Sequence, residues 1–176
     1  MKLSNVLTVV DTHTEGQPMR IVASGFPTIR GRTMREKCSY VEKNLDDLRR
    51  MILYEPRGRS TMCGAFLVEP AVPEADVGAI FMEPIGLVPM CGHGSIAIAK
   101  YLVETQRVEA TEPVTQVKLD TLAGLVNLAL SVKDGKVGEI TYAMLSLFHI
   151  FAMLKSTLRG LGALRLIWLT VAISMP

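Results

Sequence analysis

The sequence has few cysteines, almost no net charge and no long uncharged apolar run. Its three cysteines are an odd number without the spacing of a disulfide framework, which suits a reducing compartment better than secretion. Nineteen basic and 17 acidic residues give a net charge of +2, so the charge does not favour a nucleic-acid partner. Residues 1–7 have neither the apolar region nor the small-residue cleavage site of a signal peptide, and we therefore expect a cytoplasmic protein.

Acidic residues are missing from the last 33 positions. All 17 Asp and Glu lie in the first 143 residues, and at that frequency about four would be expected in residues 144–176. Lys155, Arg159 and Arg165 divide this apolar segment into stretches well below the roughly 20 residues that span a bilayer. We therefore expect no membrane helix there, and two glycines interrupt an amphipathic surface helix.

The rest of the chain alternates between apolar strands, turns and helical stretches, and is long enough for one domain with a sizeable core. A polar loop is predicted at 11–18 and a hairpin turn at Asp134-Gly135. Helices are predicted in the 33–53 region, where Leu45, Leu48 and Ile52 share one face, and at 95–105. Strands are predicted at 7–10, 19–23, 65–68, 77–81, 114–119, 125–132 and 137–142. The fold class is therefore α+β and sheet-rich, with one central helix entered through Cys91.

The stretch Met90-Cys91-Gly92-His93-Gly94 places a thiol at the start of that central helix. The first turn of a helix has free backbone N–H groups and the positive end of the helix dipole, so it lowers a thiol's pKa and can hold a carboxylate. The glycines let a ligand approach the backbone closely. This pattern predicts a reactive thiol beside an anion site.

Two other interpretations of Cys91 need weighing. Free cysteine is among the most buried residue types, so a structural cysteine beside a glycine turn is the simplest alternative. A zinc site is less favoured, because Cys91 and His93 supply at most two ligands and no second Cys/His pair has metal-site spacing. We therefore predict no metal and no other cofactor.

Several segments resemble the proline racemase family, which also includes 4-hydroxyproline 2-epimerases and trans-3-hydroxy-L-proline dehydratases. The resemblance runs from about residue 6 to residue 142. It is carried by segments 11–22 (DTHTEGQPMRIV) and 55–58 (EPRG), by Met62 with Gly64-Ala65, and above all by the 90–94 box (MCGHG). It implies one half of a two-domain, diaminopimelate epimerase-like fold.

The resemblance also implies a cofactor-independent reaction at the α-carbon of proline or hydroxyproline. Family members use two opposed thiols, one removing the α-proton and the other delivering a proton to the opposite face. Cys91 matches the first thiol, and the backbone N–H groups of Gly92 and His93 match the carboxylate-binding positions. The substrate is thus a small molecule, and the oligomeric state is left open, with a homodimer as one option.

Other polar and thiol side chains have weaker roles in this interpretation. Asp11 and His13 match the family's amino-terminal loop and either shape the site or brace it. Cys63 lacks a following His-Gly, so it is expected to take no part in the site, and Cys38 is expected in the core.

The chain departs from the family in two respects. Members are roughly twice as long, and their second domain carries the second cysteine in an Asp-x-x-Pro-Cys-Gly-Thr-Gly type box, which this sequence lacks. The acid-free tail is explained by a shifted reading frame, since residues 166–176 can be reread in another frame as V-D-M-A-Y-G-G-N-F-Y-A, which resembles the family, and residues 153–158 as D-V-E-I-D-V. We therefore predict a family-like domain at 1–143 and an aberrant tail at 144–176.

Three functions remain open at the level of sequence. The parent activity is an epimerase or racemase, or a dehydratase. The chain as printed can also be a non-enzymatic remnant, because a single Cys91 exchanges the α-proton on one face at most.

Overall fold

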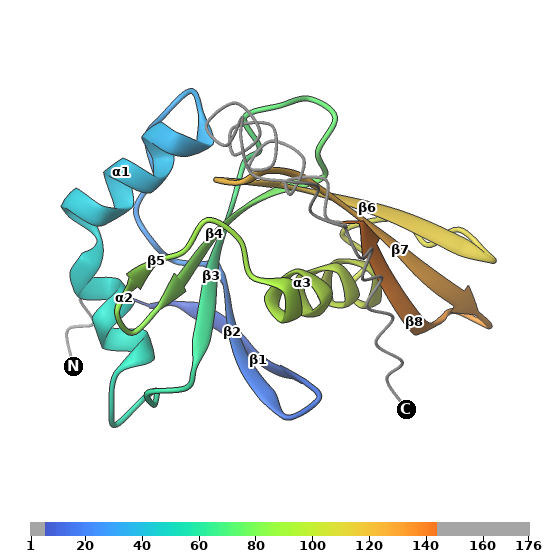
Figure 1. Ribbon diagram of the computed structural model, residues 1–176, viewed down its shortest axis with the longest axis horizontal. Coiled ribbons are helices and arrows are strands. Elements are labelled where there is room, and N and C mark those ends of the chain that lie inside the picture. The colour runs from blue at the N-terminus through green and yellow to red at the C-terminus, as the bar shows by residue number, and fades with distance from the viewer. Residues whose placement is uncertain (1–5, 144–176) are drawn as a thin grey trace, which may run out of the picture.

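A computed structural model describes residues 6–143, and the acid-free segment lies outside these residues (Figure 1). Its strands form one sheet in the order β1-β2-β3-β4-β6-β7-β8, with β5 paired to β4. The strands are β1 (Thr8–Thr14), β2 (Gln17–Ser24), β3 (Cys63–Val68), β4 (Val77–Glu83), β5 (Gly86–Leu87), β6 (Val114–Thr121), β7 (Gly124–Lys133) and β8 (Lys136–Ala143). The helices of this part are α1 (Met34–Asn44), α2 (Asp46–Leu53) and α3 (Gly92–Glu104). The predicted α+β, sheet-rich architecture is confirmed.

The helices lie in two separate hydrophobic cores. Helices α1 and α2 pack with side chains of β2, β3 and β4 such as Val22, Phe66 and Ile80. Helix α3 packs with the remaining inward side chains of the sheet, which curves around it (Figure 1). Lys100 and Glu104 are the only Lys, Arg, Asp or Glu residues of α3, and most of its other side chains are buried. A helix that is apolar nearly all round packs inside a core rather than on the surface.

Two parallel strand pairs bring distant parts of the chain together. Strands β2 and β3 run parallel, with α1 and α2 in the connection between them, and Met19 lies beside Cys63 in their register. Strands β4 and β6 are also parallel, with α3 in their connection. The first crossover places the start of β3 under the entrance of α3.

The predicted polar loop at 11–18 is wrong. The segment is a hairpin in which β1 runs through Thr14 and β2 begins at Gln17. Glu15 and Gly16 both have positive φ, 50° and 81°, the conformation of the two-residue turn that matches strand twist. The polar side chains of this segment therefore lie on a strand rather than in a loop.

The other predicted turns and helices occur with small shifts. Asp134 and Gly135 have φ of 51° and 71° and join β7 to β8 as expected. The 33–53 region contains two helices, because the chain leaves helical geometry at Leu45. Thr33 caps α1 by accepting a hydrogen bond from the Glu36 N–H.

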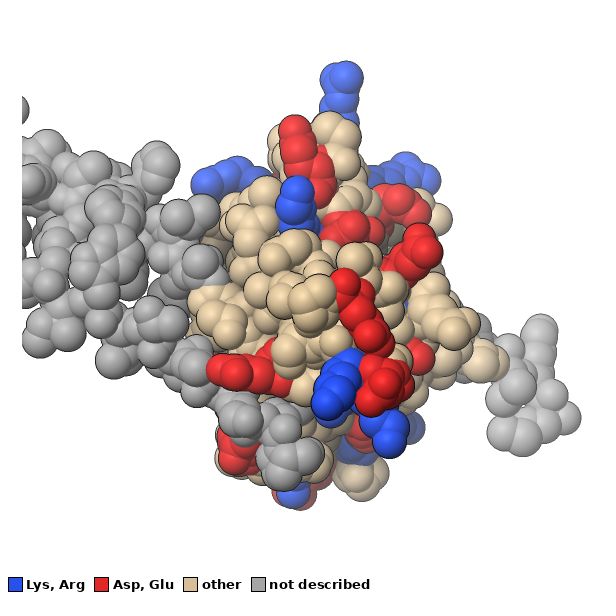
Figure 2. Space-filling model, turned by 90° about the vertical axis from the view of Figure 1, so that its right-hand side faces the viewer, with Lys and Arg blue, Asp and Glu red and all other residues tan. Residues whose placement is uncertain are grey.

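No helix among the described residues is long and apolar enough to cross a bilayer. On the face drawn in Figure 2, acidic and basic side chains are intermixed around uncharged surface. This distribution agrees with the small net charge of the sequence.

Candidate active site

Backbone hydrogen bonds fix Cys91 at the N-cap of α3. Its carbonyl accepts bonds from the backbone N–H and the side-chain hydroxyl of Ser95, both at 2.8 Å. The preceding loop is anchored by a bond from the Ala123 N–H to the Pro89 carbonyl, at 3.1 Å. The thiol is thus held at the helix entrance, in the position that the sequence predicts, and the residue is 8% exposed.

Two side chains contact the Cys91 sulfur. The imidazole Nδ1 of His93 lies 3.3 Å from it, and the Cys63 sulfur lies 3.5 Å from it. The hydrogen bond from Cys63 is the main cause that lowers the pKa of Cys91 to about 5, against the raising effect of burial, with further contributions from His93 and the Gly94 N–H. The hydrogen bond with Cys91 raises the pKa of His93. This arrangement favours a Cys91 thiolate beside a protonated imidazole.

Sequence reasoning missed Cys63, which was expected to take no part in the site. Its hydrogen bond to Cys91 and its burial raise the pKa of the Cys63 thiol far above its usual range, so it is the proton donor of the pair. Cys63, Cys91 and His93 offer sulfur and nitrogen atoms that all lie within 4.8 Å of one another. They are the described residues that could hold a soft metal ion.

Cys38 lies elsewhere, as predicted. It is buried in the α1–α2 core, where burial and the nearby Glu42 raise its pKa to about 11. It serves as an internal reference thiol for experiments on the other two.

Close contacts leave little room for a side chain at either glycine of the 90–94 box. A Cβ on Gly94 would lie 2.9 Å from the Phe81 ring and 3.2 Å from the Cys91 sulfur. A Cβ on Gly92 would lie 2.6 Å from the Tyr142 hydroxyl. Gly92, His93 and Gly94 occupy the first turn of α3, where backbone N–H groups have no carbonyl partner within the helix.

The amino-terminal hairpin reaches the site through Thr14 rather than through Asp11. The buried Thr14 hydroxyl donates a hydrogen bond to the His93 carbonyl at 3.1 Å, and the Pro18 backbone contributes to raising the pKa of His93. This hairpin therefore supports the first turn of α3 at His93.

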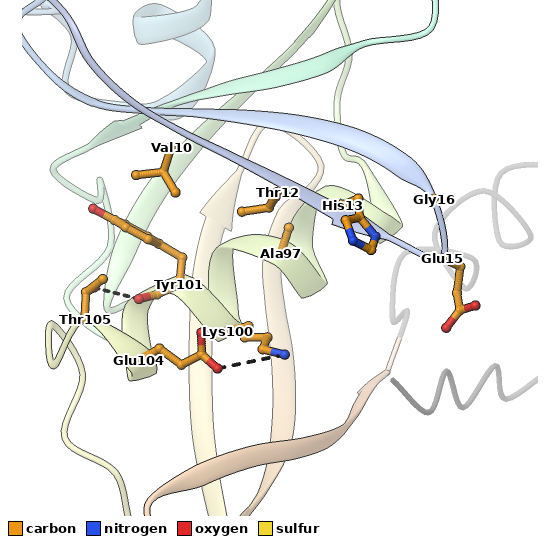
Figure 3. A pocket seen from close by; sticks show the side chains of 10 residues that line it. All are labelled: Val10, Thr12, His13, Glu15, Gly16, Ala97, Lys100, Tyr101, Glu104 and Thr105. Atoms are coloured by element: carbon orange, nitrogen blue, oxygen red, sulfur yellow. Dashed lines mark hydrogen bonds and ion pairs between the residues drawn. The ribbon is translucent and has the colours of Figure 1, made fainter. Parts of the chain in front are cut away.

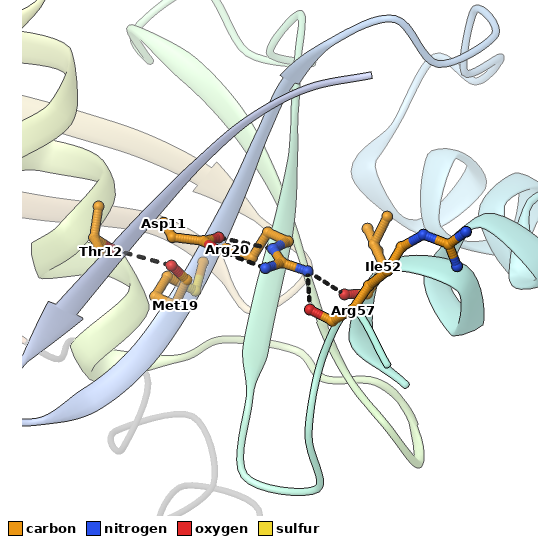
Figure 4. Close-up of polar contacts among 6 residues, drawn as sticks. All are labelled: Asp11, Thr12, Met19, Arg20, Ile52 and Arg57. Carbon is orange, nitrogen blue, oxygen red and sulfur yellow. Dashed lines mark hydrogen bonds and ion pairs between the residues drawn. The ribbon is translucent and has the colours of Figure 1, made fainter. Parts of the chain in front are cut away.

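Asp11 instead belongs to a hydrogen-bond network centred on the Arg20 side chain (Figure 4). The guanidinium donates two hydrogen bonds of 2.7 Å to the Asp11 carboxylate and one each, also 2.7 Å, to the carbonyls of Ile52 and Arg57. These bonds tie segment 55–58 to the hairpin, so two segments that carry the family resemblance support each other structurally. Arg20 holds the pKa of Asp11 below its usual value.

His13 lines a pocket of about 610 Å³ between the hairpin and α3 (Figure 3). The wall on the α3 side includes Lys100 and Glu104, whose charged groups lie 3.8 Å apart, and Tyr101. Cys63, Cys91 and His93 are not among its lining residues. Of the two roles that the sequence left open for Asp11 and His13, the Asp11 contacts correspond to bracing, and His13 lines a pocket that does not include the thiol.

Comparison with known proteins gives consistent matches. A family model described as "Proline racemase" matches residues 9–166. The chain is 45% identical to a 4-hydroxyproline 2-epimerase of Streptosporangium roseum over 141 residues, which cover 80% of the chain and 42% of the relative. It is 40% identical to a proline racemase of Clostridioides difficile over 165 residues, 94% of the chain and 49% of the relative.

A third relative is a trans-L-3-hydroxyproline dehydratase of Saccoglossus kowalevskii, 36% identical over 153 residues, 87% of the chain and 47% of the relative. Among solved structures, a hydroxyproline epimerase of Agrobacterium vitis with bound trans-4-hydroxy-L-proline superposes with a TM-score of 0.76 at 28% identity, covering 82% of the chain and 43% of that structure. The chain spans about half the length of the curated relatives it matches.

Proposed function

Because the chain belongs to the proline racemase family, we propose that it carries half of an acid/base site acting at the α-carbon of proline or hydroxyproline. The observation that carries this proposal is the Cys91 sulfur at the entrance of α3, 3.3 Å from the imidazole of His93. A thiolate in that position is a base available at neutral pH. No cofactor is needed for this chemistry.

The first turn of α3 supplies the second requirement of the reaction. Removing an α-proton moves negative charge toward the substrate carboxylate, so donors aimed at that carboxylate stabilise the transition state. The backbone N–H groups of Gly92 and His93 belong to this turn and are our candidates for these donors. The contact between Thr14 and the His93 carbonyl supports the orientation of the turn.

Stereochemical inversion requires a second acid on the opposite face of the substrate. Cys63 does not meet this requirement, because its sulfur touches Cys91 at 3.5 Å, whereas two sulfurs flanking a carbon at near-attack distance lie about 6–7 Å apart. Cys38 is in the other core, and the sequence has no fourth cysteine. We therefore expect this chain by itself to exchange the α-proton on one face without inverting the substrate.

The dehydratase relative supports a second candidate, in which the same thiol removes the α-proton and water is then eliminated. This branch acts on a 3-hydroxylated ring, because the leaving hydroxyl must be adjacent to the α-carbon. Loss of water from trans-3-hydroxy-L-proline, followed by mass spectrometry, separates it from the epimerase branch.

The test is α-deuterium incorporation into L-proline and trans-4-hydroxy-L-proline in heavy water. We expect deuterium at the α-carbon with retained configuration, loss of this exchange in Cys91→Ser, and unchanged exchange in the matched control Cys38→Ser. Inversion by the chain alone would contradict the half-site. Absence of exchange in the folded parent chain would instead favour the non-enzymatic remnant.

A further inference from the structure

Three soft ligand atoms from two separate segments meet at the entrance of α3. Cys63 begins β3, Cys91 caps α3, and His93 lies in the first turn of that helix. The Cys91 sulfur lies 3.5 Å from the Cys63 sulfur and 3.3 Å from His93 Nδ1, and the three groups lie within 4.8 Å of one another. The sequence spacing showed only two of these ligands, because the third reaches the site through the parallel pairing of β2 and β3.

The separations are close to the edges of a tetrahedral zinc site. With Zn–S of about 2.3 Å and Zn–N of about 2.0–2.1 Å, tetrahedral angles give S···S of about 3.8 Å and S···N of about 3.6 Å. The observed 3.5 Å and 3.3 Å are shorter by about 0.3 Å each. The third pair, the Cys63 sulfur and the His93 ring nitrogen, lies within 4.8 Å. To hold one ion, Cys91 must move slightly away from both partners, and the third pair must be about 3.6 Å apart.

We propose that Cys63, Cys91 and His93 form a three-ligand site for a thiophilic divalent cation such as Zn²⁺, with the fourth coordination position open. Binding releases the Cys63 thiol proton and the His93 imidazolium proton, which leaves two thiolates and one neutral imidazole as ligands. Such ligands favour this class of ion over the harder Mg²⁺ and Ca²⁺. Cation binding here does not depend on the proposed function. The bound cation should also inhibit the proposed α-proton exchange, because a metal-bound Cys91 cannot take up a proton, and this second expectation rests on the proposed function.

The surroundings of the three ligands suit a cation. Both ring nitrogens of His93 lie near the Cys91 sulfur, Nδ1 at 3.3 Å and Nε2 at 3.7 Å, so either can serve as the ligand atom. Glu83 contributes a negative charge near both Cys63 and His93. His93 is half-buried, so it is the ligand of the three that is most accessible to an incoming ion.

The experiment is a titration of the full, phosphine-reduced chain with Co²⁺, followed by absorption spectroscopy and displacement with Zn²⁺. We expect one equivalent to bind, with thiolate-to-cobalt charge-transfer bands and the intense visible bands of a tetrahedral complex. Cys63→Ser should reduce the charge-transfer intensity by about half and the affinity by at least ~10-fold. The matched control Cys38→Ser should titrate like the parent, and circular dichroism confirms that each variant is folded.

Parent-like titration of the folded Cys63→Ser variant, or a weak octahedral spectrum without charge transfer, would overturn the site. The outcome is independent of catalysis, since the spectrum is read without substrate. Failure of the proposed function shows instead as absent deuterium exchange in the metal-free chain. If exchange is present, Zn²⁺ should inhibit it in the parent, and the Zn²⁺ concentration for half-inhibition should be at least ~10-fold higher in Cys63→Ser. Equal inhibition of the two proteins by Zn²⁺ would also contradict the site.

Discussion

At the scale of single residues, the reactivity of Cys91 depends on the groups around its sulfur. Cys63 donates a hydrogen bond, and His93 contributes both a hydrogen bond and a nearby charge. Each of these interactions favours the thiolate, while burial opposes it. The sum of these effects, rather than the helix end alone, makes this thiol different from Cys38.

Alkylation at graded pH tests this account of Cys91. With a chelator present, the iodoacetamide rate at Cys91 should rise with a midpoint near pH 5, whereas an ordinary free thiol has a midpoint of about 8.5. Cys63→Ala removes the largest stabilising contact, so the midpoint should move upward. Peptide mass spectrometry measures each site separately. A midpoint that is unchanged in Cys63→Ala, as is expected for the control Cys38→Ala, would count against the thiol–thiol hydrogen bond.

Gly94→Ala tests the packing of the 90–94 box. Alanine is favoured over glycine in a helix by about 1 kcal/mol, but here the new methyl group would lie 2.9 Å from the Phe81 ring. We therefore expect the free energy of unfolding in urea to fall by about 1–3 kcal/mol, as for other overpacked sites. Lys100→Ala, on the less buried side of the same helix, is the control and should change stability by less than about 0.5 kcal/mol. A more stable Gly94→Ala protein would contradict the close contact.

At the scale of elements, the hairpin of β1 and β2 organises the molecule around the site. One residue of this hairpin, Thr14, holds the His93 carbonyl, and another, Arg20, holds the carbonyls of Ile52 and Arg57. Arg20 side-chain exposure is 12%, whereas that of Asp11 is 53%. The less exposed guanidinium, which also holds the two carbonyls, is therefore the more important member of the ion pair for stability.

Arg20→Lys should lower the free energy of unfolding by about 1–3 kcal/mol, because an ammonium group cannot satisfy the Asp11 carboxylate and both carbonyls in this geometry. Asp11→Asn should have the smaller effect of an exposed ion pair, about 0–1 kcal/mol. Urea unfolding measures both, with the exposed Arg35→Lys as control. Equal losses of unfolding free energy in the Asp11 and Arg20 variants would contradict the role of Arg20 as the centre of this network.

The Asp11–Arg20 pair also predicts the direction of a pH effect. The folded pKa of Asp11 is lowered, so its contribution to stability is fully present above the unfolded value of about 3.9 and is lost as the pH falls through the lowered folded value. The parent should therefore lose more stability than Asp11→Asn between pH 5 and the acid limit of folding.

Short-range sequence patterns predicted part of the fold and of the candidate site. They failed where the position of a residue depends on contacts with distant parts of the chain. The turn at Asp134-Gly135 and the helix after Cys91 follow from glycine chemistry and apolar periodicity over short windows. The 11–18 loop was wrong because Glu15-Gly16 forms a two-residue turn whose glycine signal was attributed to a longer loop. Cys63 was missed because its contact with Cys91 spans 28 residues and depends on strand register, which no local pattern encodes.

At the scale of the whole molecule, the match to the family and the predicted change of reading frame overlap. The family model extends to residue 166, beyond the boundary at residue 143 that is predicted from the missing acidic residues. Resequencing the gene tests the prediction. An uninterrupted frame, with no family-like coding sequence in the next frame, would contradict it.

The half-site proposal makes its strongest prediction for a mixture of this chain and the part of a relative that the chain does not match. The Streptosporangium epimerase matches this chain over only 42% of its own length, so the part of it that this chain does not match can be added as a separate polypeptide. The family resemblance implies that the opposed thiol lies in that part. We therefore expect the mixture, but neither component alone, to invert trans-4-hydroxy-L-proline, as measured by chiral chromatography. Cys91→Ser should abolish this inversion and Cys38→Ser should preserve it, because only Cys91 lies at the entrance of α3 with the depressed pKa that the reaction requires. Inversion that persists in the Cys91→Ser mixture would show that the first thiol is supplied from elsewhere.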